Sequence, residues 1–141
     1  MKHIDRQSEL EVLRTWGKPR GKTDLPRVTR GDVVAARQLL RTTVSVSPLV
    51  HECLVDIAQM LRSDKRARQG VSTRALVQAI PALQTLALLR GRDYVSSEDV
   101  EYLATPLFAH RLDLAPGARA DQVIADSIAK PIEQLSKGTL R

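Results

Sequence analysis

Aromatic residues are scarce in this chain of 141 residues, and their scarcity excludes several kinds of protein. They make up 3% of the sequence, whereas hydrophobic residues as a whole make up 43%. A core can therefore form, but it must be aliphatic, which favours helices over a β-sandwich. Nucleic-acid modules that stack bases on aromatic side chains are disfavoured for the same reason.

The sequence also has only one cysteine and no long apolar run. The single cysteine, Cys53, excludes an internal disulfide and a metal site built from several cysteines. No apolar run approaches the ~18 residues that a membrane-spanning helix needs. The first residues, MKHIDRQSELE, are charged and include no apolar signal segment. We therefore expect a cytoplasmic protein with no membrane span.

Positive charge is in excess, with 22 Lys and Arg against 16 Asp and Glu. This balance permits contact with nucleic acid, phosphates or an acidic partner without choosing among them. The densest basic stretch, GKPRGKT, approaches the phosphate-binding pattern G-x-x-x-x-G-K-[ST]. Only three residues separate Gly17 from Gly21, however, and Asp24 and Pro26 follow where a helix should begin. We interpret this stretch, including Lys22, as a solvated linker.

Apolar periodicity predicts an all-α fold, a helical bundle of five to six helices with at most a trace of β-structure. Capping residues ahead of apolar patterns predict helix starts at Thr29, Ser47, Ser72 and Ser96. The alternating, β-branched residues 42–47 (TTVSVS) predict a very short strand. Prolines inside three of the patterns predict kinks or breaks. These are Pro81, Pro106 and Pro131, of which Pro131 is expected to divide the last helix.

Side chains that carry chemistry form no self-contained active site in this sequence. None of His3, His51 and His110 has a second ligand at zinc-binding spacing, so we expect no metal site. Cys53 falls on a wide apolar arc and is interpreted as an unreactive core thiol. The carboxylates of Glu98, Asp99 and Glu101 form a cluster at a helix N-terminus, which favours negative charge.

Arg74 is unusual because it falls in the first turn of the helix that Ser72 is expected to cap. A helix N-terminus carries about +0.5 of an elementary charge, so a cation is unfavourable there and an anion is favourable. An arginine at this place is explained if a phosphate comes to it. The alternative, a solvated arginine that tolerates a small penalty, stays open at this point.

Residues 70–112 as a whole resemble the C-terminal lid domain of the MoxR family of AAA+ ATPases. The sequence there reads GVSTRALVQAIPALQTLALLRGRDYVSSEDVEYLATPLFAHRL. The family has a similar G-x-S-x-R-A start, a GR-x-YV turn, an acidic DV helix start and an HR-x-L ending. The earlier segment HIDRQSELEVLR is similar to the family's linker into the lid. The resemblance therefore implies a linker at 1–28 from a missing upstream AAA+ core and a helical lid (AAA+ small) domain at 29–114. It leaves the tail unassigned, and apolar periodicity there predicts a C-terminal helical extension at 115–141.

The same resemblance implies a role for Arg74. It matches the sensor-2 arginine, which reaches the nucleotide phosphates held by the family's large α/β domain, and Ser72 and Thr73 would support the helix start. The parent protein would use ATP and Mg²⁺ in a chaperone-like remodelling or assembly reaction. Its expected partners are the missing AAA+ large domain, neighbouring subunits of a hexamer and a protein with a von Willebrand factor A domain.

This chain matches only the small domain, because no true P-loop, Walker-B strand or arginine finger is present in the sequence. Alone it is expected to be inactive and to hold no cofactor, with any ATPase activity belonging to the parent. Two alternatives from other classes are a basic helical nucleic-acid-binding module and a stand-alone protein-interaction adaptor. On the resemblance, nucleic acid is not an expected partner.

Overall fold

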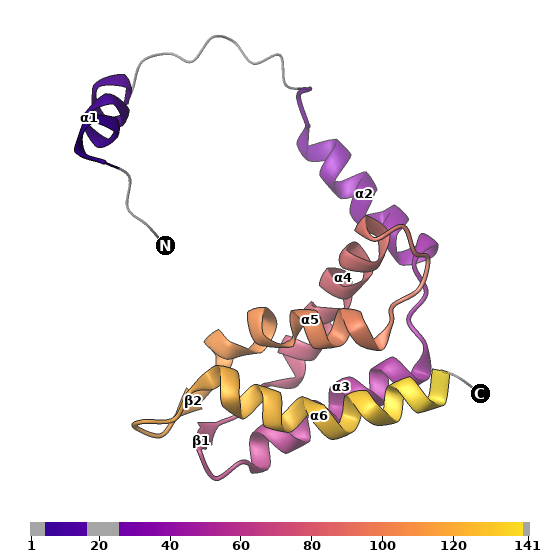
Figure 1. The fold of residues 1–141 in the computed structure, drawn as a ribbon. Coiled ribbons are helices and arrows are strands. Elements are labelled where there is room, and N and C mark those ends of the chain that lie inside the picture. The colour runs from indigo at the N-terminus through magenta and orange to yellow at the C-terminus, as the bar shows by residue number, and fades with distance from the viewer. Residues whose placement is uncertain (1–4, 17–25, 140–141) are drawn as a thin grey trace.

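The computed structural model describes residues 5–16 and 26–139, and this part of the chain is built almost entirely from helices (Figure 1). It confirms the predicted all-α fold with a trace of β-structure. The predicted linker stretch GKPRGKT lies outside the described residues. The α-helices are α1 (Arg6–Thr15), α2 (Arg30–Thr43), α3 (Pro48–Ser63), α4 (Thr73–Leu89), α5 (Ser97–Phe108) and α6 (Ala120–Thr139). The shorter elements are the 3-10 turn η1 (Ala109–Arg111) and the strands β1 (Ala67–Gln69) and β2 (Asp113–Leu114).

Side-chain caps start these helices where the sequence predicted them. Thr29 and Asp32 exchange hydrogen bonds at the start of α2, with the Asp32 carboxylate accepting the Thr29 N–H at 2.8 Å. Ser47 accepts the N–H of Val50 at 3.3 Å, and Pro48 occupies the first turn of α3. Each cap satisfies an N–H that would otherwise lack a partner at the helix end, which typically contributes ~1 kcal/mol.

The core lies between α3, α4, α5 and α6, with α6 running along α3 and packing against α5 (Figure 1). It is aliphatic, as the scarcity of aromatics predicted, and Phe108 is the one phenylalanine in the sequence. Not every apolar residue of α4 enters this core, because Val77 is 62% exposed and Leu88 is 44% exposed. The largest fully buried apolar side chains are Phe108, Ile57, Leu61, Leu83, Ile124, Val44, Val50, Val71, Val100 and Val123.

The prediction that Pro131 divides the last helix is wrong. The helix α6 runs without interruption from Ala120 to Thr139, and α5 likewise continues past Pro106 to Phe108. A proline inside a helix removes one backbone hydrogen bond and costs about 3 kcal/mol. Pro131 is itself buried, and the α6 side chains on either side of it enter the core. Burying that apolar surface offsets the lost hydrogen bond.

The β-structure lies elsewhere than predicted. In the expected strand at 42–47, α2 extends through Thr43 and Ser45 forms only an isolated parallel bridge with Tyr94. The ladder that does form pairs β1 with β2 in antiparallel orientation, and β1 lies in the polar connector between α3 and α4. A strand of three residues is too short to show an alternating pattern. The ladder joins the segment before α4 to the segment after α5.

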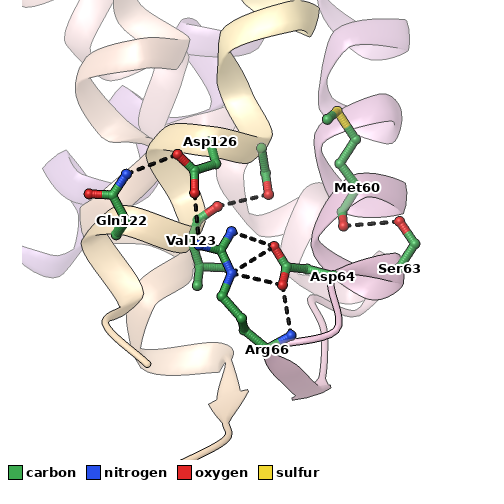
Figure 2. Close-up of polar contacts among 8 residues, drawn as sticks. Met60, Ser63, Asp64, Arg66, Gln122, Val123 and Asp126 are labelled. Atoms are coloured by element: carbon green, nitrogen blue, oxygen red, sulfur yellow. Dashed lines mark hydrogen bonds and ion pairs between the residues drawn. The ribbon is translucent and has the colours of Figure 1, made fainter. Parts of the chain in front are cut away.

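Arg66 ties this connector to α6 (Figure 2). Its guanidinium donates to Asp64 at the end of α3 at 2.7 Å and to Asp126 of α6 at 2.8 Å. Backbone bonding adds to this, because the N–H of Ala115 donates to the Arg66 carbonyl at 2.8 Å. The helix that we assigned to a C-terminal extension thus shares the core of the bundle, while the boundaries at 28 and 114 stay predictions.

Replacing Ile57 by alanine is expected to destabilise the bundle strongly. Ile57 is 0% exposed in the middle of α3, so the change leaves a cavity in the hydrophobic core. The free energy of unfolding should fall by roughly 2–5 kcal/mol in a urea titration of the 141-residue chain. Val55 on the same helix is 44% exposed, so Val55→Ala should change it by no more than about 0.5 kcal/mol. Equal losses from the two variants would contradict the position of the core.

Candidate functional site

The start of α4 carries the residues that the sequence singled out. The hydroxyl of Ser72 accepts the N–H of Ala75 at 3.3 Å, which confirms Ser72 as the N-cap, and Thr73 and Arg74 follow as the first two helical residues. Val71 and Ala75 on either side are 1% and 3% exposed. The helix start is therefore anchored in the core while the residues between these two anchors face outward.

Arg74 itself is exposed and makes no hydrogen bond or ion pair with any other described residue. The first turn of α4 contains no acidic residue. The backbone N–H groups of Thr73 and Arg74 likewise find no acceptor within the described part of the chain. A free guanidinium and unpaired N–H groups at a positive helix end make this turn attractive to an anion.

Two further arginines approach the same helix from other elements. The Nε–H of Arg62, in the last turn of α3, donates to the carbonyl of Val71 at 2.7 Å. Arg111 of η1 donates to the side-chain oxygen of Gln78 at 2.9 Å. Residues four apart share a face of a helix, so Gln78 holds Arg111 one turn along from Arg74. The sequence analysis missed both arginines, because neither is near α4 in the sequence.

The opposite end of α4 is followed by a turn that begins at Gly91. Gly91 has φ +74°, the left-handed conformation expected of a residue just past a helix end. Two backbone hydrogen bonds join this turn to the loop after α2. The Ser45 N–H donates to the Asp93 carbonyl at 2.8 Å, and the Ser45 carbonyl accepts the Val95 N–H at 3.1 Å. Within α4, the buried amide of Gln84 donates to the Val44 carbonyl at 2.7 Å. These contacts fix the far end of the helix that carries Arg74.

Asp99 lies buried beside this turn and was expected only as a capping residue. Its side chain is 0% exposed and accepts hydrogen bonds from Arg90 at 2.9 Å and from Arg92 at 2.7 and 2.9 Å. The N–H and hydroxyl of Ser96 also donate to it, at 2.9 and 3.1 Å. Burial alone would raise the pKa of Asp99, but the bonds from Arg92 and Ser96 outweigh burial and lower that pKa. The carboxylate is therefore charged at neutral pH.

Each of these arginines also stacks on a tyrosine. The guanidinium of Arg90 lies 4.9 Å from the ring centre of Tyr102, and that of Arg92 lies 5.6 Å from the ring centre of Tyr94. The sequence signal for this cluster was the pair of arginines around Gly91, just before a capped aspartate. The sequence did not predict the buried ion-pair cluster, because a capping role requires only an exposed carboxylate, whereas the Asp99 carboxylate is buried. Glu98 and Glu101, the other members of the predicted acidic cluster, are exposed.

Other reactive groups within the described residues do not form a second site. Burial, with a smaller effect of the Asp56 charge, raises the pKa of the Cys53 thiol to about 11, so little reactive thiolate forms at neutral pH. His51 and His110 are exposed. No cluster of three or more His, Cys, Asp or Glu residues that could hold a metal ion occurs in the described ranges. In the same ranges, no helix has the length and apolar character needed to cross a membrane.

Comparison with known proteins relates this helical bundle to ATPase lids. A family model described as the AAA lid domain matches residues 59–132. The uncharacterised protein YeaC of Bacillus subtilis is 31% identical over 125 residues, covering 88% of this chain and 39% of that protein. Chaperone MoxR1 of Mycobacterium tuberculosis is 29% identical over 143 residues, covering 91% of this chain and 36% of that protein. Protein MoxR of Paracoccus denitrificans is 30% identical over 83 residues, covering 50% of this chain and 24% of that protein.

A solved structure has the same fold. The crystal structure of a candidate ATPase from Cytophaga hutchinsonii aligns with a TM-score of 0.71 and 23% identity, covering 92% of this chain and 44% of that one. The chain thus spans little more than a third of the first two relatives, at 39% and 36%.

Replacing Asp99 by asparagine is expected to cost roughly 3 kcal/mol of unfolding free energy. This is the low end of the cost of breaking a buried pair, because Arg90 and Arg92 stay 33% and 21% exposed. Since the folded-state pKa of Asp99 lies below its ordinary value of 3.8, its contribution is present above that pH and is lost as the pH falls through the folded-state pKa. The variant should therefore lose less stability on acidification than the original chain.

Urea titrations at neutral pH and near pH 3 measure both effects. Glu101→Gln is the matched control, because Glu101 lies exposed on the same helix, and it should change the unfolding free energy by no more than about 0.5 kcal/mol. An Asp99→Asn chain as stable as the original at neutral pH would show that the buried cluster contributes nothing.

Proposed function

Because the chain belongs to the AAA lid domain family and is of the MoxR type, we propose that Arg74 is a sensor-2 arginine that binds the phosphates of ATP. The observation that carries this proposal is that Arg74 has no partner among the described residues, at the acid-free N-terminus of a firmly held helix. An arginine that forms no ion pair with any described carboxylate, at such a place, is suited to an anion that comes from outside the chain.

The chemistry of the helix start fits a phosphate group. A guanidinium offers forked N–H donors that match phosphate oxygens, and such charge-assisted bonds are roughly twice as strong as neutral ones. The unpaired N–H groups of Thr73 and Arg74 lie at the same positive helix end and can donate to the ligand. Ser72 supports this turn by accepting the N–H of Ala75. The phosphates themselves would be held by an α/β domain that this chain does not contain.

The same groups do not fit the Mg²⁺ ion that accompanies ATP. Magnesium takes oxygen ligands, chiefly carboxylates, phosphates and water, whereas the first turn of α4 offers cations and N–H groups and no acidic side chain. The metal would therefore be bound by the nucleotide and the large domain. The lid would supply positive charge to phosphate oxygens, which spread negative charge during phosphoryl transfer.

In the whole protein, the position of the lid relative to the large domain would depend on whether ATP or ADP is bound. Hydrolysis and release of phosphate remove the group that Arg74 contacts, so the lid would bind the ATP and ADP states differently, as any nucleotide-driven shift requires. The relative named a chaperone supports a cytoplasmic ATPase that remodels or assembles other proteins. Neighbouring ATPase subunits, arranged as a hexamer, and a protein with a von Willebrand factor A domain are the partners in this proposal.

Replacing Arg74 by alanine in the longer protein that contains the large domain should slow ATP hydrolysis by roughly 100- to 1000-fold, the range for losing one transition-state donor. Arg74→Lys retains the charge but not the forked donors, so its rate of ATP hydrolysis should lie between those of the original protein and of Arg74→Ala. The lid should stay as stable as before, because Arg74 is exposed and without a partner among the described residues. Steady-state ATPase assays and thermal melting measure the two quantities.

Arg119→Ala is a suitable control for this experiment. Arg119 is an exposed arginine too, 79% accessible in its side chain, and among the described residues its side chain pairs with Asp121 alone, at 2.6 Å. Surface pairs of this kind contribute about 0–1 kcal/mol, so neither the rate nor the stability should change appreciably. An Arg74→Ala protein that hydrolyses ATP at the original rate would refute the proposed role.

A further inference from the structure

The junction between α3 and α4 is held by two contacts in addition to its apolar packing in the core. The first is the hydrogen bond from the Arg62 Nε–H to the Val71 carbonyl at 2.7 Å. Val71 directly precedes the N-cap Ser72 and is 1% exposed, so its carbonyl is part of a fixed segment. The bond therefore fastens the last turn of α3 to the residue from which α4 begins.

The second contact is a close approach of backbone to backbone at Gly70. A Cβ built on Gly70 would lie 2.7 Å from the Cα and the Cγ of Arg62 and 2.9 Å from its backbone nitrogen. Backbone atoms cannot rotate away from such an overlap, so only glycine fits here. The sequence Gly70-Val71 thus lies directly against Arg62, which brings the donor of Arg62 to the carbonyl of Val71.

These contacts determine where Arg74 is presented. Only Ser72 and Thr73 separate Val71 from Arg74, and a helical side chain moves with its backbone. Arg62 itself forms no hydrogen bond with Arg74. If the bond to Val71 were lost, the first turn of α4 would have one restraint fewer and could shift slightly, while the core residues further along α4 kept the fold intact.

We propose that Arg62 is a positioning residue for Arg74, locking the start of α4 through Val71 and the close packing on Gly70. This inference rests on the proposed phosphate-binding role of Arg74. Arg62 acts through geometry and not through contact with the nucleotide. Displacing a catalytic group by about 1 Å can cost as much as 100-fold in rate, so a modest shift of the turn has a measurable effect.

A double-mutant cycle in the longer, ATPase-containing protein tests this proposal. Arg62→Met retains the side-chain stem that lies on Gly70 but removes the donor, and it should lower kcat roughly 3- to 100-fold. In an Arg74→Ala background, Arg62→Met should lower kcat by less than about twofold, because there is no guanidinium left to position. Arg62→Lys can still donate to the Val71 carbonyl and should restore part of the rate.

Arg68→Met is the matched control. Arg68 lies in the same connector, and its exposed side chain makes no hydrogen bond or ion pair with any other described residue, so its loss should leave kcat unchanged. Gly70→Ala provides a second route to the same junction and should reproduce the effect of Arg62→Met, again only when Arg74 is present.

The outcomes separate the two proposals. If Arg74→Ala slows hydrolysis but Arg62→Met and Gly70→Ala do not, the positioning role is wrong and the phosphate-binding role stands. Equal losses from Arg62→Met in both backgrounds would likewise overturn it, since Arg62 would then act independently of Arg74. If Arg74→Ala leaves kcat unchanged, the proposed function fails and the positioning role fails with it.

Discussion

The buried carboxylate of Asp99 is the interaction on which the geometry of this lid depends. It accepts bonds from two arginines of the α4–α5 turn and from the first cap of α5, so one charged group joins the end of one helix to the start of the next. A buried charge is costly unless every lone pair is satisfied, and here five donors meet it. The cluster therefore permits one arrangement of the turn and penalises others. Because the β1–β2 ladder joins the segments at the other end, α4 and α5 are held relative to each other at both ends.

The proposed site follows from this rigidity. The start of α4 is fastened by Ser72, Val71 and Arg62, while the far end is fastened by Asp99 and by the bridge at Ser45. Between these fixed points, the chain places a single unpartnered guanidinium where a helix end favours an anion. Such a site is half complete. It provides positive charge in a defined position and leaves the phosphate to another domain, which agrees with a chain that spans little more than a third of its first relatives.

Sequence reasoning predicted the helices well because their starts carry local signals. Capping by Thr29 and Ser72 and the left-handed Gly91 depend on residues within a few positions of each other. It failed where distant contacts decide the outcome. Pro131 was expected to break α6, but burial on both sides of the proline outweighs its missing hydrogen bond. Arg62 and Arg111 could not be placed near α4, since their bonds to Val71 and Gln78 depend on the packing of whole helices. For the candidate site, the sequence thus indicated Arg74 and its cap but not the residues that hold them.

The most direct test is a high-resolution structure of the longer protein, containing its large domain, with a non-hydrolysable ATP analogue bound. We expect the Arg74 guanidinium to lie about 2.7–2.9 Å from a phosphate oxygen, the distance of a charge-assisted hydrogen bond. In the same structure, Arg62 should keep its bond to the Val71 carbonyl. A nucleotide whose phosphates are contacted only by other residues, with Arg74 directed into solvent, would contradict the account.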